Sequence, residues 1–226
     1  MNVDGAFTLV YFLEVFANPI YLEGLRNAFF IAFLTTLFSF ILSLPLAFAS
    51  DRFQFRGKFI LQSLLLVPII LPPFVGAIGV KQIFGQYGAV NSFLQSIGLL
   101  SSDATIDWIG MNPFWGVVIL NTLHLYPIIY LNAVAALANI DPNMEEAAES
   151  LGSTGIQKFR KITLPLIRPG LFAGGTIVFI WAFTELGVPL IFDYSRVTSV
   201  QIYYGIKDIG GSPFPYALVA AILMGS

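Results

Sequence analysis

The chain has 226 residues, of which 57% are hydrophobic and 11% are charged, whereas soluble domains have about 25% charged residues. Its 11 Lys and Arg residues are balanced by 13 Asp and Glu residues, so the basic surplus of a nucleic-acid-binding protein is absent. Cysteine is absent and histidine occurs once, which excludes disulfide scaffolds, thiolate metal sites and histidine clusters. These proportions predict an integral membrane protein, and its apolar segments of helical spanning length indicate that it is all-α.

Long segments with few charges predict the membrane spans. No charged residue lies between Arg26 and Asp51, and a helix of about 20 apolar residues crosses a bilayer. Four further apolar segments follow, and the last one stops at the end of the chain before it reaches spanning length. We therefore expect a chain that is cut short in its last span and also lacks a helix before the first. The expected spans are residues 27–49, 59–80, 112–137, 169–192 and 213–226, the last of them incomplete.

Two segments are expected to lie at the membrane surface rather than to cross it. Residues 82–102 are rich in Gln, Asn, Ser and Gly, and apolar residues recur at helical spacing from Val90 to Ile97. This pattern predicts a short amphipathic helix. Residues 6–19 form a similar segment, which lacks the basic start of a signal peptide.

The Lys and Arg residues predict the orientation. Seven of the 11 fall at residues 50–58 and 138–168, and an excess of basic residues marks the cytoplasmic side. The N-terminus is therefore expected outside, and residues 138–168 form the longest cytoplasmic loop. The seven basic residues are Arg52, Arg56, Lys58, Lys158, Arg160, Lys161 and Arg168.

The loop at 138–168 contains the local signals of two short helices. Asp141 suits the cap of the first helix, and Gly152 suits its end. A T-x-x-Q capping box beginning at Thr154 is expected to start the second helix. Pro165 is expected to end this second helix, because a proline keeps the preceding residue out of the helical conformation.

The first of these helices is expected to be apolar on one face and acidic on the other. Met144, Ala147, Ala148 and Leu151 form a narrow apolar stripe, and Glu residues share the opposite side. Small alanines let another protein approach closely, and a helix of this kind suits docking in a groove. The alternative is that the stripe packs against the chain's own helices.

The loop resembles the EAA loop in permease subunits of binding-protein-dependent ABC importers. The family pattern is E-A-A-x3-G-x9-I-x-L-P, and all seven positions match with the spacing intact. The matching residues are Glu146, Ala147, Ala148, Gly152, Ile162, Leu164 and Pro165. The resemblance implies a five-span type I ABC importer permease core, in which these residues and Leu151 couple the spans to a cytoplasmic ATPase.

The resemblance also implies partners. The chain would be a non-catalytic half of a translocation pathway in a prokaryotic cytoplasmic membrane, completed by a second permease half on the same or another chain. This sequence lacks the G-x-x-x-x-G-K-[ST] phosphate loop, so the chain is not the ATPase itself. The resemblance implies that a separate dimer of ATP-binding subunits binds ATP and Mg. No cofactor or metal is expected in the chain itself. An extracytoplasmic substrate-binding protein would contact residues 82–110 and 193–212.

Two stretches are most similar to ferric-iron-type permeases within this family. They are ILPPFVGAIGVKQIFGQYGAVN and FTELGVPLIF, at residues 70–91 and 183–192. The resemblance therefore implies ferric iron as the substrate. Permeases for polyamines, phosphonates, thiamine or sulfate share the architecture and are the alternatives.

Three polar residues inside the expected spans are candidates for the translocation pathway. Glu185 lies in the fourth span, where an unpaired carboxylate costs on the order of several kcal/mol. The alternative is that Gly187 and Pro189 interrupt the helix there and leave Glu185 near water. Asn121 and His124 lie in the third span, and a lone His in such a place is more often a hydrogen-bonded packing residue than a ligand.

Two rival functions remain open at this point. One is an ion- or proton-coupled secondary transporter or channel that uses Glu185 and His124, although such proteins commonly contain internal repeats. The other is an intramembrane enzyme, which needs paired polar catalytic groups at matched depth. The sequence shows neither internal repeats nor such a pair beyond these two residues.

Small polar residues recur in the first expected span. Thr35, Thr36, Ser39 and Ser43 fall at roughly helical spacing. Within membranes, small residues allow helices to approach closely and to hydrogen-bond with one another. We expect this face to pack against other spans.

Overall fold

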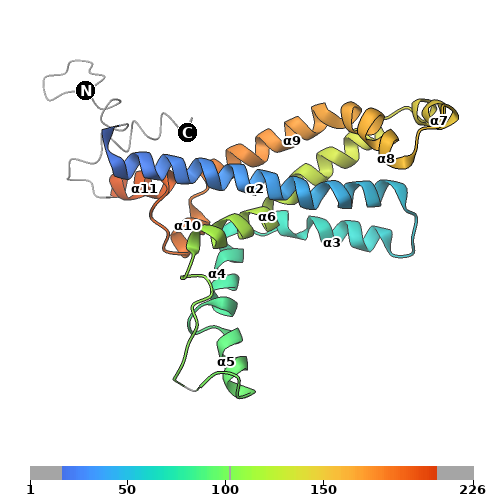
Figure 1. The fold of residues 1–226 in the computed structure, drawn as a ribbon. Coiled ribbons are helices and arrows are strands. Elements are labelled where there is room, and N and C mark those ends of the chain that lie inside the picture. Colours follow the sequence, from blue (N-terminus) through green and yellow to red (C-terminus); the bar gives the residue numbers. More distant parts are fainter. Residues whose placement is uncertain (1–16, 102, 208–226) are drawn as a thin grey trace, which may run out of the picture. The chain divides into compact units, whose positions relative to one another are not determined.

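The computed structural model describes residues 17–101 and 103–207 (Figure 1). All regular elements within these ranges are helices, which confirms the predicted all-α fold. The expected incomplete span 213–226 and nearly all of the surface segment 6–19 lie outside the described residues.

Most helices of the described part follow one another with short connections, and the long connection is that between α5 and α6 (Figure 1). In chain order they are α2 (Pro19–Arg52), α3 (Lys58–Ile70), α4 (Pro73–Phe84), α5 (Ala89–Ser96), α6 (Pro113–Ala138), α7 (Pro142–Ser150), α8 (Gly155–Lys158), the π-helix η1 (Phe159–Thr163), α9 (Leu164–Thr184), α10 (Gly187–Ile191) and α11 (Thr198–Lys207). Among the described residues, three helical stretches are long and apolar enough to cross a membrane, and α3 with the helices after it would make a fourth. The three are Pro19–Arg52, Pro113–Ala138 and Gly155–Ile191.

The segment expected as the second span, 59–80, is divided between α3 and α4. The break lies at Leu71, whose φ of −85° and ψ of 133° are those of extended backbone. Pro72 follows, and a proline disfavours the helical conformation of the residue before it. Pro73 then occupies the first position of α4, where a missing N–H costs nothing. The two consecutive prolines therefore end one helix and start the next.

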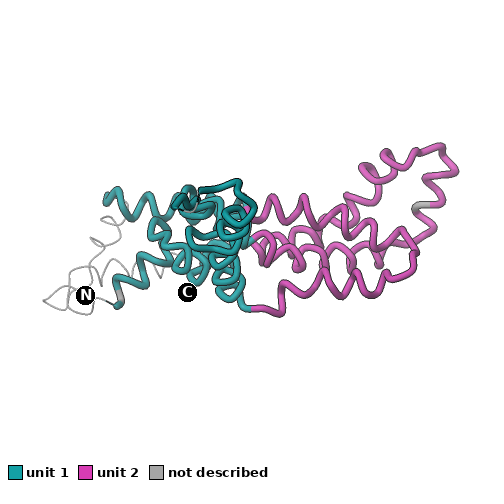
Figure 2. The backbone as a smooth tube through the Cα atoms, turned by 90° about the horizontal axis from the view of Figure 1, so that it is seen from below, with its two compact units in different colours: residues 1–34, 72–121, 181–226 teal, residues 35–71, 122–180 magenta. Residues whose placement is uncertain are grey.

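The described helices form two compact units (Figure 2). Unit 1 is formed by the described parts of residues 1–34, 72–121 and 181–226, and unit 2 by residues 35–71 and 122–180. Helices α2, α6 and α9 each contribute residues to both units. The expected cytoplasmic loop belongs to unit 2, and the expected external segments belong to unit 1.

Small side chains line the packed face of α2. Thr35, Ser39 and Ser43 are fully buried and Thr36 is half-buried, as the spacing of these residues predicts. In unit 2, Ser43 Oγ donates a hydrogen bond of 2.7 Å to the carbonyl oxygen of Tyr126 on α6. Small residues thus bring the backbones of α2 and α6 close enough for a side chain to reach the neighbouring main chain.

Two glycines place α9 close to α6 in unit 2. A Cβ atom at Gly170 would lie 2.9 Å from Cβ of Ala136, and one at Gly174 would lie 3.1 Å from Cβ of Asn132. These residues form a G-x-x-x-G pattern, which allows close contact between membrane helices. The G-x-x-x-G pattern can be read from the sequence and could have predicted that this face of α9 packs closely against another helix.

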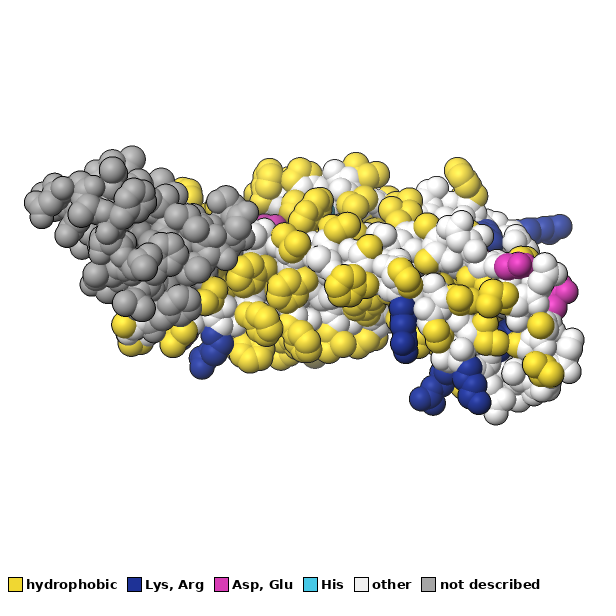
Figure 3. Space-filling model, turned by 90° about the horizontal axis from the view of Figure 1, so that it is seen from above, with side chains coloured by type: hydrophobic (Ala, Val, Ile, Leu, Met, Phe, Trp, Pro, Cys, Tyr) yellow, Lys and Arg dark blue, Asp and Glu magenta, His cyan; other side chains and the backbone are white. Residues whose placement is uncertain are grey.

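The surface of the helices is strongly apolar. Hydrophobic side chains cover much of the visible face, while most of the visible Lys and Arg side chains gather near the end that carries α7 (Figure 3). Exposed apolar side chains include Phe33 and Ile41 on α2 and Phe172 on α9. A surface of this kind is typical of helices that contact lipid or neighbouring subunits.

Candidate functional site

The two helices of the loop at 138–168 begin as predicted. Asp141 Oδ1 accepts a hydrogen bond of 2.9 Å from the backbone N–H of Asn143, and Pro142 occupies the first position of α7. At the start of α8, the backbone N–H of Thr154 donates to Gln157 Oε1 at 3.4 Å, as part of the predicted capping box. Both helix starts are therefore stabilised by their own side chains.

The end of α7 is also fixed locally. Gly152 has a φ of 79°, a left-handed conformation that glycine adopts without strain. The backbone N–H of Ser153 donates to the carbonyl of Ala148 at 3.0 Å, and that of Gly152 donates to the carbonyl of Glu149 at 2.9 Å. These two bonds make a Schellman motif. The Glu149 carboxylate also pairs with the Lys158 ammonium, which connects α7 to α8.

The second helix of the loop does not end at Pro165, so this prediction is wrong. Helix α8 continues through η1 into α9 without interruption. Pro165 has no N–H for the carbonyl four residues earlier. The π-turn accommodates it, because the N–H of Leu164 donates to the carbonyl of Phe159, five residues earlier. Ile162, Leu164 and Pro165 are half-buried and connect the loop to the span as one helix.

The apolar stripe of α7 is largely uncovered. Ala148 is only 5% exposed, and α7 packs against α8 and η1. Leu151, in contrast, is 87% exposed and Met144 is 48% exposed. Ala147 and Glu146 are exposed as well. One small side chain therefore anchors α7 to its own loop, while the larger apolar side chains have little cover from the described residues.

Glu185 lies at an interruption of the fourth expected span, where α9 ends at Thr184 and α10 starts at Gly187. Its Oε1 atom accepts hydrogen bonds from the backbone N–H groups of Gly187 at 2.8 Å and Val188 at 3.2 Å. Ser199 Oγ donates to the backbone carbonyl of Glu185 at 2.7 Å. The carboxylate thus caps the first turn of α10, which agrees with the interpretation that the helix is interrupted here.

Asn121 and His124 both lie on α6. Asn121 is 1% exposed, and its amide nitrogen has no hydrogen-bond partner within the described residues. Buried polar atoms are usually paired, so Asn121 stays a candidate for the translocation pathway. His124 is half-buried. The described part of the chain contains no group of three His, Asp or Glu side chains that could hold a metal ion.

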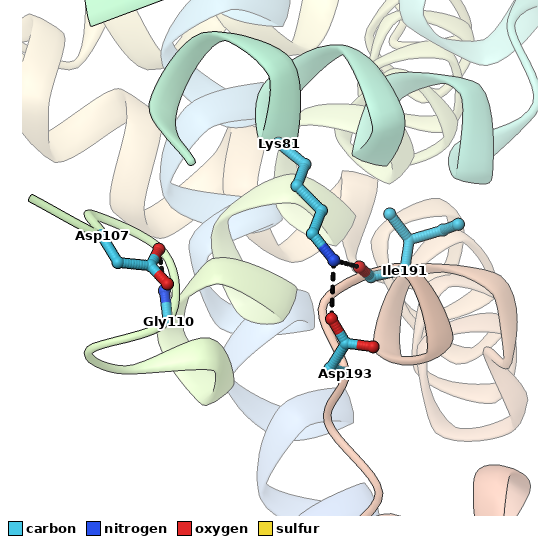
Figure 4. A network of polar contacts seen from close by, with 5 residues as sticks. All are labelled: Lys81, Asp107, Gly110, Ile191 and Asp193. Atoms are coloured by element: carbon cyan, nitrogen blue, oxygen red, sulfur yellow. Dashed lines mark hydrogen bonds and ion pairs between the residues drawn. The ribbon is translucent and has the colours of Figure 1, made fainter. Parts of the chain in front are cut away.

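A cavity of about 850 Å³ lies in unit 1 between α4, the segment before α6 and the end of α10. Lys81 Nζ donates hydrogen bonds to the Asp193 carboxylate at 2.6 Å and to the Ile191 carbonyl at 2.8 Å (Figure 4). Asp107 Oδ1 accepts a hydrogen bond of 2.7 Å from the N–H of Gly110. The Lys81 and Asp193 side chains are 48% and 82% exposed, so this charged pair is open to solvent.

The amphipathic helix expected within 82–102 is present as α5, but a polar residue holds it in place. Asn91 is 2% exposed, and its Nδ2 atom donates to the carbonyl oxygens of Gln86 at 2.9 Å and Ile106 at 2.7 Å. Phe93, from the apolar face, is 62% exposed. Periodicity predicts the helix but not the role of Asn91, because its partners lie in loops.

The segment after α10 is attached to the start of α2 within unit 1. The Arg196 guanidinium lies 3.4 Å from the Glu23 carboxylate, and Asn27 Nδ2 donates to the Arg196 carbonyl at 2.8 Å. These two contacts hold residues 193–196 against α2. Burial raises the pKa of the Tyr194 phenol above its ordinary value, and the Arg196 charge partly offsets this effect.

A bundle of apolar helices whose loop combines the E-A-A-x3-G-x9-I-x-L-P pattern with a capped, exposed helix defines a membrane permease subunit. The chain belongs to the family of binding-protein-dependent transport system inner membrane components, which matches residues 20–225. It is therefore an ABC importer permease subunit, as the loop predicts.

Several relatives are similar along most of this chain. It is 32% identical over 204 residues to a probable molybdenum ABC transporter permease protein of Haloferax volcanii, covering 89% of this chain and 71% of that protein. It is 31% identical over 214 residues to the ferric transport system permease protein FbpB of Actinobacillus pleuropneumoniae. That match covers 94% of this chain but 28% of the relative, so the chain spans less than a third of the ferric permease.

The sulfate transport system permease protein CysT of Salmonella typhimurium is 26% identical over 218 residues, which cover 94% of this chain and 75% of the relative. The fold is similar to the crystal structure of a bacterial ABC transporter involved in the import of the acidic polysaccharide alginate. The TM-score is 0.75 at 21% identity, over 98% of this chain and 79% of that chain. This likeness confirms the predicted type I permease fold.

Proposed function

We propose that the chain forms half of the translocation pathway of an ATP-driven importer and that α7 transmits the movements of a cytoplasmic ATPase to the spans. The observation that carries this proposal is the combination of a locally fixed helix with an uncovered apolar stripe. Leu151 is 87% exposed although both ends of α7 are capped. An exposed apolar patch of this kind marks a protein contact, and a groove on the ATPase subunit is the partner that the family relationship supports.

The continuous helix from α8 through η1 to α9 supports a mechanical connection. A force on α7 reaches α8 through their contact and the Glu149–Lys158 pair. The same helix then enters the span without a break. In this proposal, a dimer of ATPase subunits binds ATP and Mg, and its closure moves the spans between inward-facing and outward-facing states.

The remaining partners are a second permease half and an extracytoplasmic substrate-binding protein. The relationship to binding-protein-dependent systems supports both. The cavity beside Lys81 and Asp193 supports a contact with the binding protein, because it is lined by these two exposed charged side chains as well as by apolar ones. Asn91 and Arg196 give the neighbouring segments a defined shape for that contact.

We propose ferric iron as the first substrate to test, with molybdate and sulfate beside it. The relatives named for molybdenum and ferric ions have nearly the same identity to this chain, at 32% and 31%. The sulfate relative follows at 26%. Uptake of each labelled ion by proteoliposomes with the complete transporter and its binding protein would identify the substrate.

The coupling role is tested with Leu151→Asp. A carboxylate in an apolar groove costs on the order of several kcal/mol, so we expect at least a tenfold loss of ATPase subunit that co-purifies with the permease. Tyr87→Asp is the matched control, since Tyr87 is also 87% exposed but lies in the expected external segment. Equal co-purification of the ATPase with wild type and Leu151→Asp would contradict the proposal.

A further inference from the structure

Unit 2 contains a second cavity, which the proposed coupling does not use. It has a volume of about 600 Å³ and lies between α2 and the first turns of the helix that begins at Gly155. Its walls are apolar and include Phe40, Ile41, Leu44 and Phe48 from α2, together with Ile156 and Phe159 from the other side. Ile41 is 60% exposed and Ile156 is 75% exposed, so the cavity is a groove that opens to the outside of the chain.

The groove runs along α2 towards its cytoplasmic end. From Phe40 to Phe48 the helix rises about 12 Å at about 1.5 Å per residue. The rings of Phe48 and Phe159 meet edge to face with centroids 5.4 Å apart, which joins the two walls. One turn further, the Arg52 guanidinium lies 5.5 Å from the centroid of the Phe48 ring. The apolar groove therefore has a cation at one end.

Basic residues are in excess in the two segments that form this end of the groove. Arg160 and Lys161 follow Phe159 directly in η1, and both are exposed. The acidic neighbour is Asp51, whose carboxylate lies 3.5 Å from Nε of Arg52. Three cations and one anion leave a positive balance. Basic clusters at the cytoplasmic side of membrane helices attract anionic lipid headgroups.

We propose that the groove binds an anionic phospholipid of the inner leaflet, with an acyl chain between α2 and Ile156 and the phosphate beside Arg52. The apolar walls match an acyl chain, and the positive balance matches the headgroup. A helix of the second permease half would also cover apolar walls, but it would have no use for the cations. The assignment of the groove to the inner leaflet rests on the proposed function, which places α7 and its loop on the cytoplasmic side.

The test uses the assembled transporter, including its ATPase subunits, in micelles with equal amounts of phosphatidylglycerol and phosphatidylcholine. Native mass spectrometry counts the lipids retained by the complex. We expect wild type to retain phosphatidylglycerol over phosphatidylcholine. Arg52→Gln should lower this preference about fivefold, as expected for one basic residue at a membrane surface. Arg26→Gln, at the other end of the same helix, should leave the preference unchanged.

A second variant tests the groove itself. Leu44→Trp fills it and should reduce the retention of both lipids, while Ile60→Trp on exposed α3 should have no effect. Equal retention of the two lipids by wild type, or unchanged retention in Leu44→Trp, would overturn the proposal. So would efficient cross-linking of Ile41→Cys to the second permease half. Leu151→Asp should keep the lipid preference, so a failure of coupling and a failure of lipid binding can be told apart.

Discussion

Glu185 is a carboxylate in the middle of an apolar segment, and its surroundings explain how it is tolerated. Two backbone N–H groups at the start of α10 point at one of its oxygens. Such bonds to a charged acceptor are stronger than neutral ones, and they supply partners that a transmembrane carboxylate otherwise lacks. If Glu185 serves as a helix cap, substitutions at this position should have other effects than if its charge serves the translocation pathway.

A cap needs an acceptor oxygen rather than a charge. We therefore expect Glu185→Gln to keep transport within about twofold of wild type, because its amide oxygen can accept the same hydrogen bonds. Glu185→Ala removes the acceptor and should destabilise the complex by about 1 kcal/mol, with a clear loss of transport. Thermal unfolding of the purified complex and uptake by proteoliposomes measure the two effects. A strong transport loss in Glu185→Gln without a change in unfolding would instead place the charge in the pathway.

At the scale of elements, the contact between α6 and α9 depends on the absence of side chains. The backbone of Gly170 faces Ala136 and the carbonyl of Asn132, which a Cβ atom would approach to 2.9 and 3.2 Å. The carbonyl belongs to a helix backbone and cannot move aside as a flexible side chain can. Any larger residue at Gly170 must therefore push the two helices apart.

Gly170→Val should destabilise unit 2 by about 1 to 3 kcal/mol, the usual cost of overpacking. Ala173→Val adds bulk to the same helix at an exposed position and serves as the control. Thermal unfolding of the two variants in the same detergent compares them directly. If both unfold at the same temperature as wild type, the close contact between α6 and α9 is not required for stability.

At the scale of the whole molecule, helix starts and turns could be predicted from the sequence, whereas several features that depend on contacts between elements could not. The Asp141 cap and the turn at Gly152 could be predicted because their partners lie within a few residues. The continuation of the helix past Pro165 could not be predicted, because it depends on the π-turn η1, which forms together with the following span. The role of Asn91 was missed because one of its carbonyl partners, Ile106, lies 15 residues further along the chain, in a loop whose path the sequence does not predict.

The membrane class followed from composition alone, whereas the coupling role needed both the sequence motif and the exposure of its side chains. Ala148 belongs to the motif but is buried, so it serves the loop itself. Leu151, at the C-terminal cap of α7, is not one of the seven matching positions but is 87% exposed, against 48% for Met144. The surface that we propose meets the ATPase is therefore defined by the exposure of its side chains, and not only by the residues that match the family pattern.

The central claim is that this exposed stripe lies against an ATPase subunit, and cross-linking tests it most directly. The chain has no cysteine, so Leu151→Cys introduces a single reactive thiol, and Tyr87→Cys supplies a control of the same 87% exposure. With a second cysteine in the groove of the co-encoded ATPase subunit, we expect a nucleotide-dependent cross-link from Leu151→Cys and none from Tyr87→Cys. The absence of a cross-link from Leu151→Cys in an assembled, active complex would contradict the account.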